Sequence, residues 1–444
     1  MQTAKRIPYY ASLVLLAYMP FHIFLAQSLS LVTGGLDVWK IAKDILLAVV
    51  VLFAICLVWG TGRATKQFKL LFAVSAAYAA MHAILWIAHP DIYKQSAELG
   101  VLYNLRLPAF VLLGYSAVLL KPDLYKNRTL IALILGVSGV VALLGVIQYF
   151  LPPDILTHVG YSIERGVRPN FFIDNKAGFP RIMSTLREPN ALGAYLIIPM
   201  SLTVLVWAKV KEQKHKLLLI ALFALYSVAL LWTFSRSAWI GAIIAVGLVL
   251  TWNYRTVLLH FVRRFWLVCL LALLGLGAVA YAQRNTPFVQ GYISHTSNDK
   301  DIDSNQYHYL FVKQGIEGII HQPLGHGPGT AGLASIQNPK GGQLTENYYV
   351  QIGYEVGVIG LLLFVALNVM IYGMLWRTRT TMLGAALLSS FWAYVLINML
   401  LHSWSNEAVA CQWWLLAGMA AAGAAQSSKV KKSAFRSSAT KHDE

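Results

Sequence analysis

Arginines stand where long apolar stretches of this sequence begin and end. Arg181 and Arg187 precede Pro189-Asn190, which opens one such stretch, and Arg236 lies between two others. Free backbone N–H groups at a helix start and guanidinium groups both bind anions, so these positions predict a site for a phosphate-like group. Arg236 is the sharpest candidate, because an arginine between apolar stretches is costly unless it meets an anion or water.

The arginines also have simpler interpretations. They can reach lipid phosphates with their long side chains, or pair with neighbouring acids. Arg106, which lies inside an apolar stretch, raises the same question. It either pairs with a buried acid or lines the same cavity as the other arginines.

Two residues are candidates for a general base. Glu346, followed by Asn347, begins another apolar stretch, and His326 lies in the glycine-rich turn 325–330. A carboxylate or an imidazole can take a proton from a hydroxyl group if its geometry and pKa suit. For Glu346 the competing interpretation is a favourable partner of the helix dipole. For His326 the competing interpretation is that the glycine-rich segment is simply a backbone turn without a chemical role.

The sequence does not predict a metal site. Asp299, Asp301 and Asp303 resemble the start of a calcium loop, but Ser304 stands at the glycine position and Leu310 where the bidentate acid should be. We therefore expect a solvated acidic surface. Zinc-type spacing is also missing among the histidines of this region, which are His295, His308, His321 and His326.

Composition determines the class of protein. Of the 444 residues, 57% are apolar and 12% charged, which predicts an all-α polytopic membrane protein. Apolar runs of about 20 residues span a bilayer with their backbone hydrogen bonds satisfied internally. We expect twelve transmembrane helices, near residues 9–31, 41–59, 69–88, 100–120, 130–151, 189–208, 217–233, 237–252, 265–283, 348–375, 382–401 and 407–426.

Charge predicts the orientation of these spans. Alternate loops counted from the N-terminus hold 22 of the 36 basic residues, which puts both termini in the cytoplasm. The same rule accounts for the net charge of +17, so we do not expect nucleic-acid binding. Two long loops, near 152–188 and 284–347, then face outward, and the second includes an amphipathic helix expected from Asp303 to Ile320.

The expected organisation is one transmembrane domain, residues 1–426, with a basic, disordered cytoplasmic tail at 427–444. Its short cytoplasmic connectors contain no phosphate-binding loop, which argues against an ATP-driven pump and against an enzyme that uses cytoplasmic nucleotide-sugars. The three cysteines, Cys56, Cys269 and Cys411, all fall inside spans. We expect them to be small core residues rather than a disulfide framework.

Three short motifs resemble those of a known family. The first runs from Phe179-Pro180-Arg181 through Pro189-Asn190 to Leu196, and the second from Thr233-Phe234-Ser235-Arg236 to Trp239. The third combines Pro323-Leu324-Gly325-His326 to Gly329 with Glu346-Asn347-Tyr348-Tyr349 and with Glu355-Val356-Gly357 to Leu361. Together, over about residues 179–361, they resemble the O-antigen ligase and Wzy-type polymerase superfamily of bacterial envelope glycan assembly.

The resemblance implies a metal-independent, cofactor-free glycosyltransferase of the GT-C-like type in the bacterial cytoplasmic membrane. The donor would be a glycan on undecaprenyl diphosphate, and the acceptor a hydroxyl group of a glycan, lipid or other cell-surface molecule on the outer face. By position, Arg181 and Arg236 match arginines expected to hold the donor diphosphate, and Arg187 is an additional candidate. Asn190 and Asn347 are expected to support them.

One departure from the family pattern affects the reaction. O-antigen ligases typically have a histidine beside the asparagine of the last motif, where this chain has Glu346. The sequence therefore favours Glu346 as the base, with His326 as the alternative. It also favours a polymerase, or a ligase for another surface glycan, over a strict lipopolysaccharide ligase. A transporter or flippase of lipid-linked glycan is the alternative from another class, because arginines also suit a substrate path.

Overall fold

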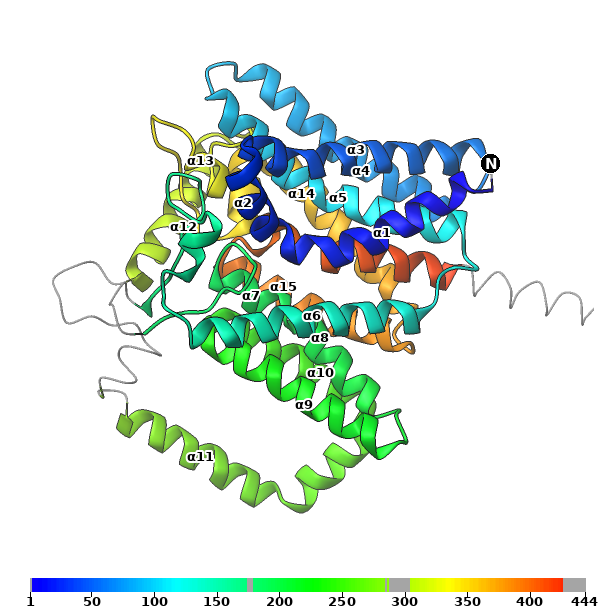
Figure 1. Cartoon of the computed structure of the whole chain (residues 1–444), viewed down its shortest axis with the longest axis vertical. Coiled ribbons are helices and arrows are strands. Elements are labelled where there is room, and N and C mark those ends of the chain that lie inside the picture. The colour runs from blue at the N-terminus through cyan, green and yellow to red at the C-terminus, as the bar shows by residue number, and fades with distance from the viewer. Residues whose placement is uncertain (1, 174–178, 284–285, 287–303, 426–444) are drawn as a thin grey trace, which may run out of the picture.

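The protein is built almost entirely of helices. A computed structural model describes residues 2–173, 179–283, 286 and 304–425 (Figure 1). In these ranges β pairing is limited to three isolated bridges, so the all-α prediction is confirmed. The acidic run 299–303, His295 and the tail 427–444 lie outside the described residues.

Eleven helices of the described chain are long and apolar enough to cross a membrane. Eighteen residues at 1.5 Å each give about 27 Å, close to the thickness of the hydrocarbon core. The eleven spans are Ala4–Thr33, Leu36–Gly60, Lys66–Ala88, Lys94–Leu120, Asn127–Tyr149, Pro189–Trp207, Gln213–Trp232, Arg236–Thr256, Tyr348–Trp376, Met382–Leu400 and Glu407–Ala425. Each corresponds, within a few residues, to a span predicted from the sequence.

Three of these spans are made of shorter helices in line. A 3₁₀ turn containing Pro20 separates α1 from α2, α7 passes directly into α8, and α16 continues through a π-helical turn at Cys411–Leu415. The bounds up to the middle of the chain are α1 (Ile7–Tyr18), α2 (His22–Thr33), α3 (Leu36–Gly60), α4 (Lys66–Ala88), α5 (Lys94–Leu120), α6 (Asn127–Tyr149), α7 (Pro189–Tyr195), α8 (Ile197–Trp207) and α9 (Gln213–Trp232). They continue with α10 (Arg236–Arg264), α11 (Trp266–Gln283), α12 (Ser304–His321), α13 (Gly332–Ser335), α14 (Tyr348–Trp376), α15 (Met382–Leu400) and α16 (Glu407–Ala410).

The remaining expected span, 265–283, corresponds to the helix α11, some of whose side chains lie outside the described part of the chain. It packs against α10 and lies apart from the other helices, at the foot of Figure 1. The next helix, α12, lies at the end of the helices where α10 begins. Between the end of α10 and the start of α12 the chain has therefore come back to that end. His308 of α12 is close enough to Arg236, the first residue of α10, to be affected by its charge.

The long loops gather at this same end. We call it the loop end of the helices, made of residues 150–173, 179–188 and 304–347, and Figure 1 shows α12 and α13 there. The expected amphipathic helix is α12, Ser304–His321, so this prediction is confirmed. Residues of this end form a small apolar cluster of their own, which includes Leu156, Tyr161 and Met183.

Four charged residues form a paired cluster inside the spans. Arg106 on α5 donates from Nε and Nη2 to the Asp44 carboxylate at 2.9 and 3.0 Å, and from Nη1 to Glu407 at 3.3 Å. Lys43 donates to Asp44 at 2.8 Å. Two cations thus meet two anions within hydrogen-bond distance, which is how charge is accommodated in a membrane. Of the two interpretations of Arg106, pairing with a buried acid is therefore confirmed.

The prediction for the cysteines is partly wrong. Cys411 is buried and free, as expected of a core residue, but Cys56 is exposed on the outer surface of the helices. Its helix, α3, turns one face outward, and a position in an apolar run does not say which face a residue occupies. The side chain of Cys269 lies outside the described part.

Glycines bring the central helices into backbone contact. A Cβ atom on Gly114 of α5 would lie 2.2 Å from the Leu415 carbonyl oxygen, and one on Gly418 would lie 2.2 Å from that of Val111. Small residues at membrane helix interfaces permit such close approach, which adds van der Waals contact. These two spans, Lys94–Leu120 and Glu407–Ala425, are both largely buried in the protein.

We expect Gly418→Ala to destabilise the protein by about 1–3 kcal/mol, because the added methyl group forces two backbones apart. The measurement is the thermal unfolding midpoint of the purified protein in detergent. Gly136→Ala in α6 is the control, since its Cβ would meet nothing within 4 Å and alanine is the better helix former. Equal midpoints for Gly418→Ala and the wild type would contradict the prediction.

Candidate active site

The side chain of Arg181 joins three separate segments at the loop end. Its Nε donates to the Thr233 carbonyl at 2.8 Å, and its Nη2 donates to Asn190 Oδ1 at 2.9 Å. Arg181 itself comes from the loop before α7, Asn190 from the first turn of α7, and Thr233 from the turn between α9 and α10. The first two sequence motifs are therefore parts of one structure.

Local packing holds these segments in place. The backbone N–H of Ile182 donates to the Trp232 carbonyl at 3.1 Å, and Pro189 occupies the first turn of α7, where proline is well tolerated. A Cβ atom on Gly193 would lie 2.6 Å from the Cβ of Ala238, so α7 and α10 approach closely. The glycine of the first motif is needed for this contact.

Arg236 is the first residue of α10, a helix of 29 residues. The turn before it is tight: Phe234 has a φ of +49°, and the N–H of Ser235 donates to Thr233 Oγ1 at 3.2 Å. Arg236 thus stands at a helix N-terminus, where backbone N–H groups also favour anions. Arg181 reaches the same turn through Thr233, which brings two of the three predicted arginines together.

Arg187, the third arginine, directly precedes Glu188 in the sequence and is half-buried. It donates to the Tyr103 hydroxyl at 3.5 Å and to the Gly166 carbonyl at 3.3 Å. The ring of Tyr103 also lies 4.9 Å from the guanidinium carbon of Arg106. Arg187 is therefore next to the buried ion pairs rather than within the Arg181–Asn190 contact.

Glu346 has an unusual backbone conformation, with a φ of +48°. Both of its neighbours are fixed: Thr345 shares a 3.0 Å hydrogen bond with His402, and the amide of Asn347 donates to the Met399 carbonyl at 3.0 Å. The Asn347 side chain also caps α14 by accepting from the N–H groups of residues 349 and 350. The predicted helix start is confirmed, and Asn347 is its N-cap.

The carboxylate of Glu346 is half-buried among titratable groups. Its Oε2 lies 3.9 Å from Nδ1 of His308. Burial raises the pKa of Glu346, and the nearby carboxylate of Glu188 raises it further. Burial also raises the pKa of Glu188, although Arg187 and Arg181 oppose this. A carboxyl group with a raised pKa is suited to proton transfer near neutral pH.

Left-handed backbone marks the site. In the described part of the chain, the non-glycine residues with a positive φ are Ser184, Phe234 and Glu346. Each falls inside one of the three sequence motifs, and each of these conformations costs free energy that the surroundings must supply. Such residues cluster at functional sites, where the turn aims neighbouring side chains.

His326 lies elsewhere on the loop end. Its ring stacks on Tyr354 at 3.9 Å between centroids, and its N–H donates to the Tyr354 carbonyl at 2.9 Å. The glycine-rich turn that contains it is anchored by the buried Glu355, whose carboxylate accepts from the N–H groups of Gly329 and Ala331 at 3.0 and 3.4 Å. The contacts of His326 within the described chain are thus those of a structural turn, as the simpler interpretation predicted.

Sequence patterns do not single out His402, and they present His308 only as a potential metal ligand. In the sequence, Glu188 is only one of the acids that neighbour the arginines. Their membership of the site follows from contacts over long sequence separations, which no local pattern reveals. Glu188 alone had a usable signal, since it stands between Arg187 and Pro189 at a helix start.

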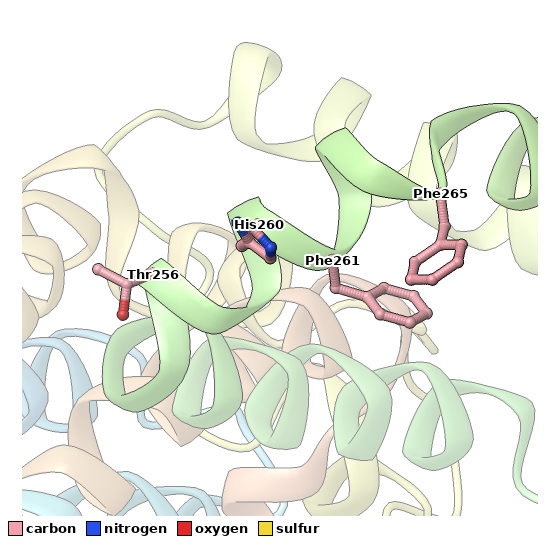
Figure 2. A pocket seen from close by; sticks show the side chains of 4 residues that line it. All are labelled: Thr256, His260, Phe261 and Phe265. Atoms are coloured by element: carbon pink, nitrogen blue, oxygen red, sulfur yellow. The ribbon is translucent and has the colours of Figure 1, made fainter.

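No group of three potential metal ligands forms among the described residues. The arrangement can instead hold an anion with arginines and accept a proton on a carboxylate a short distance away. A hollow lined by Thr256, His260, Phe261 and Phe265 lies at the far end of α10 (Figure 2). It contains none of the residues discussed above, so we do not assign the chemistry to it.

A family model described as O-Antigen ligase matches residues 221–365, a region that runs from α9 to α14. It includes Arg236, His308 and Glu346, whereas Arg181 and Arg187 precede it. No curated protein matches the chain.

The cap of α14 can be tested directly. We expect Asn347→Ala to cost about 1 kcal/mol and to speed hydrogen exchange at the amides of residues 349 and 350, because their acceptor is lost. Hydrogen–deuterium exchange with mass spectrometry measures this. Asn338→Ala, which disturbs an exposed turn, is the control and should leave these amides unchanged. Unaltered exchange in Asn347→Ala would contradict the assignment.

Proposed function

From the match of residues 221–365 to the O-antigen ligase family, we propose that the protein is a membrane glycosyltransferase. It transfers a glycan from undecaprenyl diphosphate to an acceptor hydroxyl on the outer face of the bacterial cytoplasmic membrane, without a metal ion. The reaction is that of an O-antigen ligase or of a Wzy-like polymerase. The proposed acceptor is a glycan, a lipid or another molecule of the cell envelope.

One observation carries this proposal: the hydrogen bonds of Arg181 connect the first two sequence motifs. Glu346 lies near them, because Glu188 is close enough to affect its pKa and is itself affected by Arg181. Arg181 and Arg236 flank one turn at the start of α10, and Arg236 also influences His308, which faces Glu346. Anion-binding groups and a candidate base therefore occupy one end of the protein. Glycan transfer needs both.

Each group has a defined part in the proposed reaction. As the bond between sugar C1 and the phosphate oxygen breaks, negative charge develops on the diphosphate, and the guanidinium groups of Arg181 and Arg236 stabilise it. Glu346 takes the proton of the acceptor hydroxyl as its oxygen bonds to C1. Arg187 extends the positive surface, and Asn190 holds Arg181.

The transporter alternative has less support. It would be favoured by arginines distributed along a path through the membrane. Arg181 and Arg236 instead lie at the loop end, where α7 and α10 begin. Arg106, which lies deeper, is bound to Asp44 and Glu407.

We expect Arg236→Ala and Arg181→Lys to lower glycan transfer by about 100- to 1,000-fold, because each removes preorganised stabilisation of the leaving group. The assay combines purified protein with undecaprenyl-diphosphate-linked oligosaccharide from the source bacterium. A product ladder would indicate a polymerase, and transfer to another carrier a ligase. Arg168→Lys, an exposed change in the same loop, is the control. Normal transfer by both site variants would refute the proposal.

The pH dependence tests the role of Glu346. A carboxylate is a base only when ionised, that is, above its pKa, so transfer should fall as the pH drops through the raised pKa of Glu346. Glu188→Gln removes one cause of that rise and should move the acid limb of the rate profile to lower pH. Glu346→Gln should abolish the limb together with most activity. If the acid limb of Glu188→Gln lies at the same pH as that of the wild type, this assignment is contradicted.

A further inference from the structure

His308 lies where it can serve Glu346. It is in the second turn of α12, with Nδ1 3.9 Å from the Glu346 carboxylate. Both side chains are about one-third exposed, 31% for His308 and 35% for Glu346, so the pair borders solvent. A distance of 3.9 Å can be bridged by one water molecule or by a small side-chain rotation, and catalytic contacts are often this long without substrate.

The packing of α12 fixes this position. Gly315 follows His308 by seven residues, so both lie on the same face of the helix. A Cβ atom on Gly315 would lie 2.5 Å from the Val350 side chain and 3.1 Å from that of Thr345. The same face of α12 therefore touches the segment that carries Glu346, and His308 is held above its carboxylate.

The charged groups around His308 come from several elements. Arg236 at the start of α10 acts on it, His402 lies on the segment before α16, and Glu188 next to α7 faces Glu346. Burial and Arg236 both lower the pKa of His308, so its imidazole is neutral at pH 7 and can accept a proton. Burial lowers the pKa of His402 to about 4, and its ring is already bonded to Thr345.

We propose that His308 is a positioning residue and proton partner of Glu346: it orients the carboxylate and accepts the proton that Glu346 takes from the acceptor hydroxyl. This inference rests on the proposed glycan transfer. It adds to that function a route by which the base is regenerated.

The step balances without another reactant. The C1–O bond to phosphate breaks, and its electron pair stays on the diphosphate oxygen. The acceptor oxygen bonds to C1, and its proton passes to the Glu346 carboxylate. That proton then moves from the Glu346 carboxyl group to a ring nitrogen of neutral His308, and the imidazolium releases it to water. Glu346 is ionised again for the next cycle, and one proton is released per transfer.

The test compares His308→Ala with wild-type protein in the same assay of purified full-length chain and undecaprenyl-diphosphate-linked oligosaccharide. We expect transfer to fall between about 10- and 100-fold, less than the loss of a general base causes. Added imidazole should restore part of the rate in His308→Ala but none in Glu346→Gln. The acid limb should move to higher pH, because the imidazolium that would stabilise the carboxylate in acid is gone.

His321→Ala is the matched control, since this histidine ends the same helix, is exposed and bonds to its own backbone turn. It should keep the wild-type rate and pH profile. Wild-type behaviour of His308→Ala, while Arg236→Ala and Glu346→Gln are inactive, would overturn this inference and leave the proposed function standing. A loss without imidazole rescue and with an unmoved acid limb would also overturn it, since that is the signature of packing alone. Absence of transfer by the wild-type protein would instead refute the proposed function.

Discussion

The arrangement of the loop end depends on the side chain of Arg181. Its guanidinium group spans from the Thr233 carbonyl to Asn190, so a loop, the start of α7 and the turn before α10 are fixed relative to one another. A planar group with several donors can do this, whereas an ammonium group has no comparable rigid fork. The position of Arg236 follows, because it comes three residues after Thr233.

Strained backbone is the second part of this preorganisation. Ser184, Phe234 and Glu346 all adopt left-handed conformations that non-glycine residues avoid. At Glu346 the strain is maintained because Thr345 is bonded to His402, before α16, and Asn347 to the Met399 carbonyl at the end of α15. Groups held this way need no reorganisation when charge develops, which is where an enzyme gains most from electrostatic stabilisation.

Charged side chains are buried in ion pairs among the helices, whereas at the loop end they are partly exposed to solvent. Arg106 and Lys43 neutralise Asp44 and Glu407 deep in the protein, as buried charges must be neutralised. Arg187 connects the two levels through Tyr103, whose ring lies against Arg106. The buried ion pairs therefore contact the loop end through Tyr103 and Arg187. The carboxylate of Glu346 and the imidazole of His308 remain in contact with solvent.

The sequence by itself determined the all-α membrane fold, the position of the eleven confirmed spans and the amphipathic α12, because apolar length and helical periodicity are local properties. It also marked Arg181, Arg236 and Glu346, since charge next to an apolar run is conspicuous. Only the tertiary structure decided that Arg181 binds Thr233 and Asn190, that Cys56 faces outward and that α11 lies apart from the other helices. It alone brought His308 to Glu346, because that contact depends on how α12 packs on α14, and packing between distant segments leaves no periodic trace in the sequence.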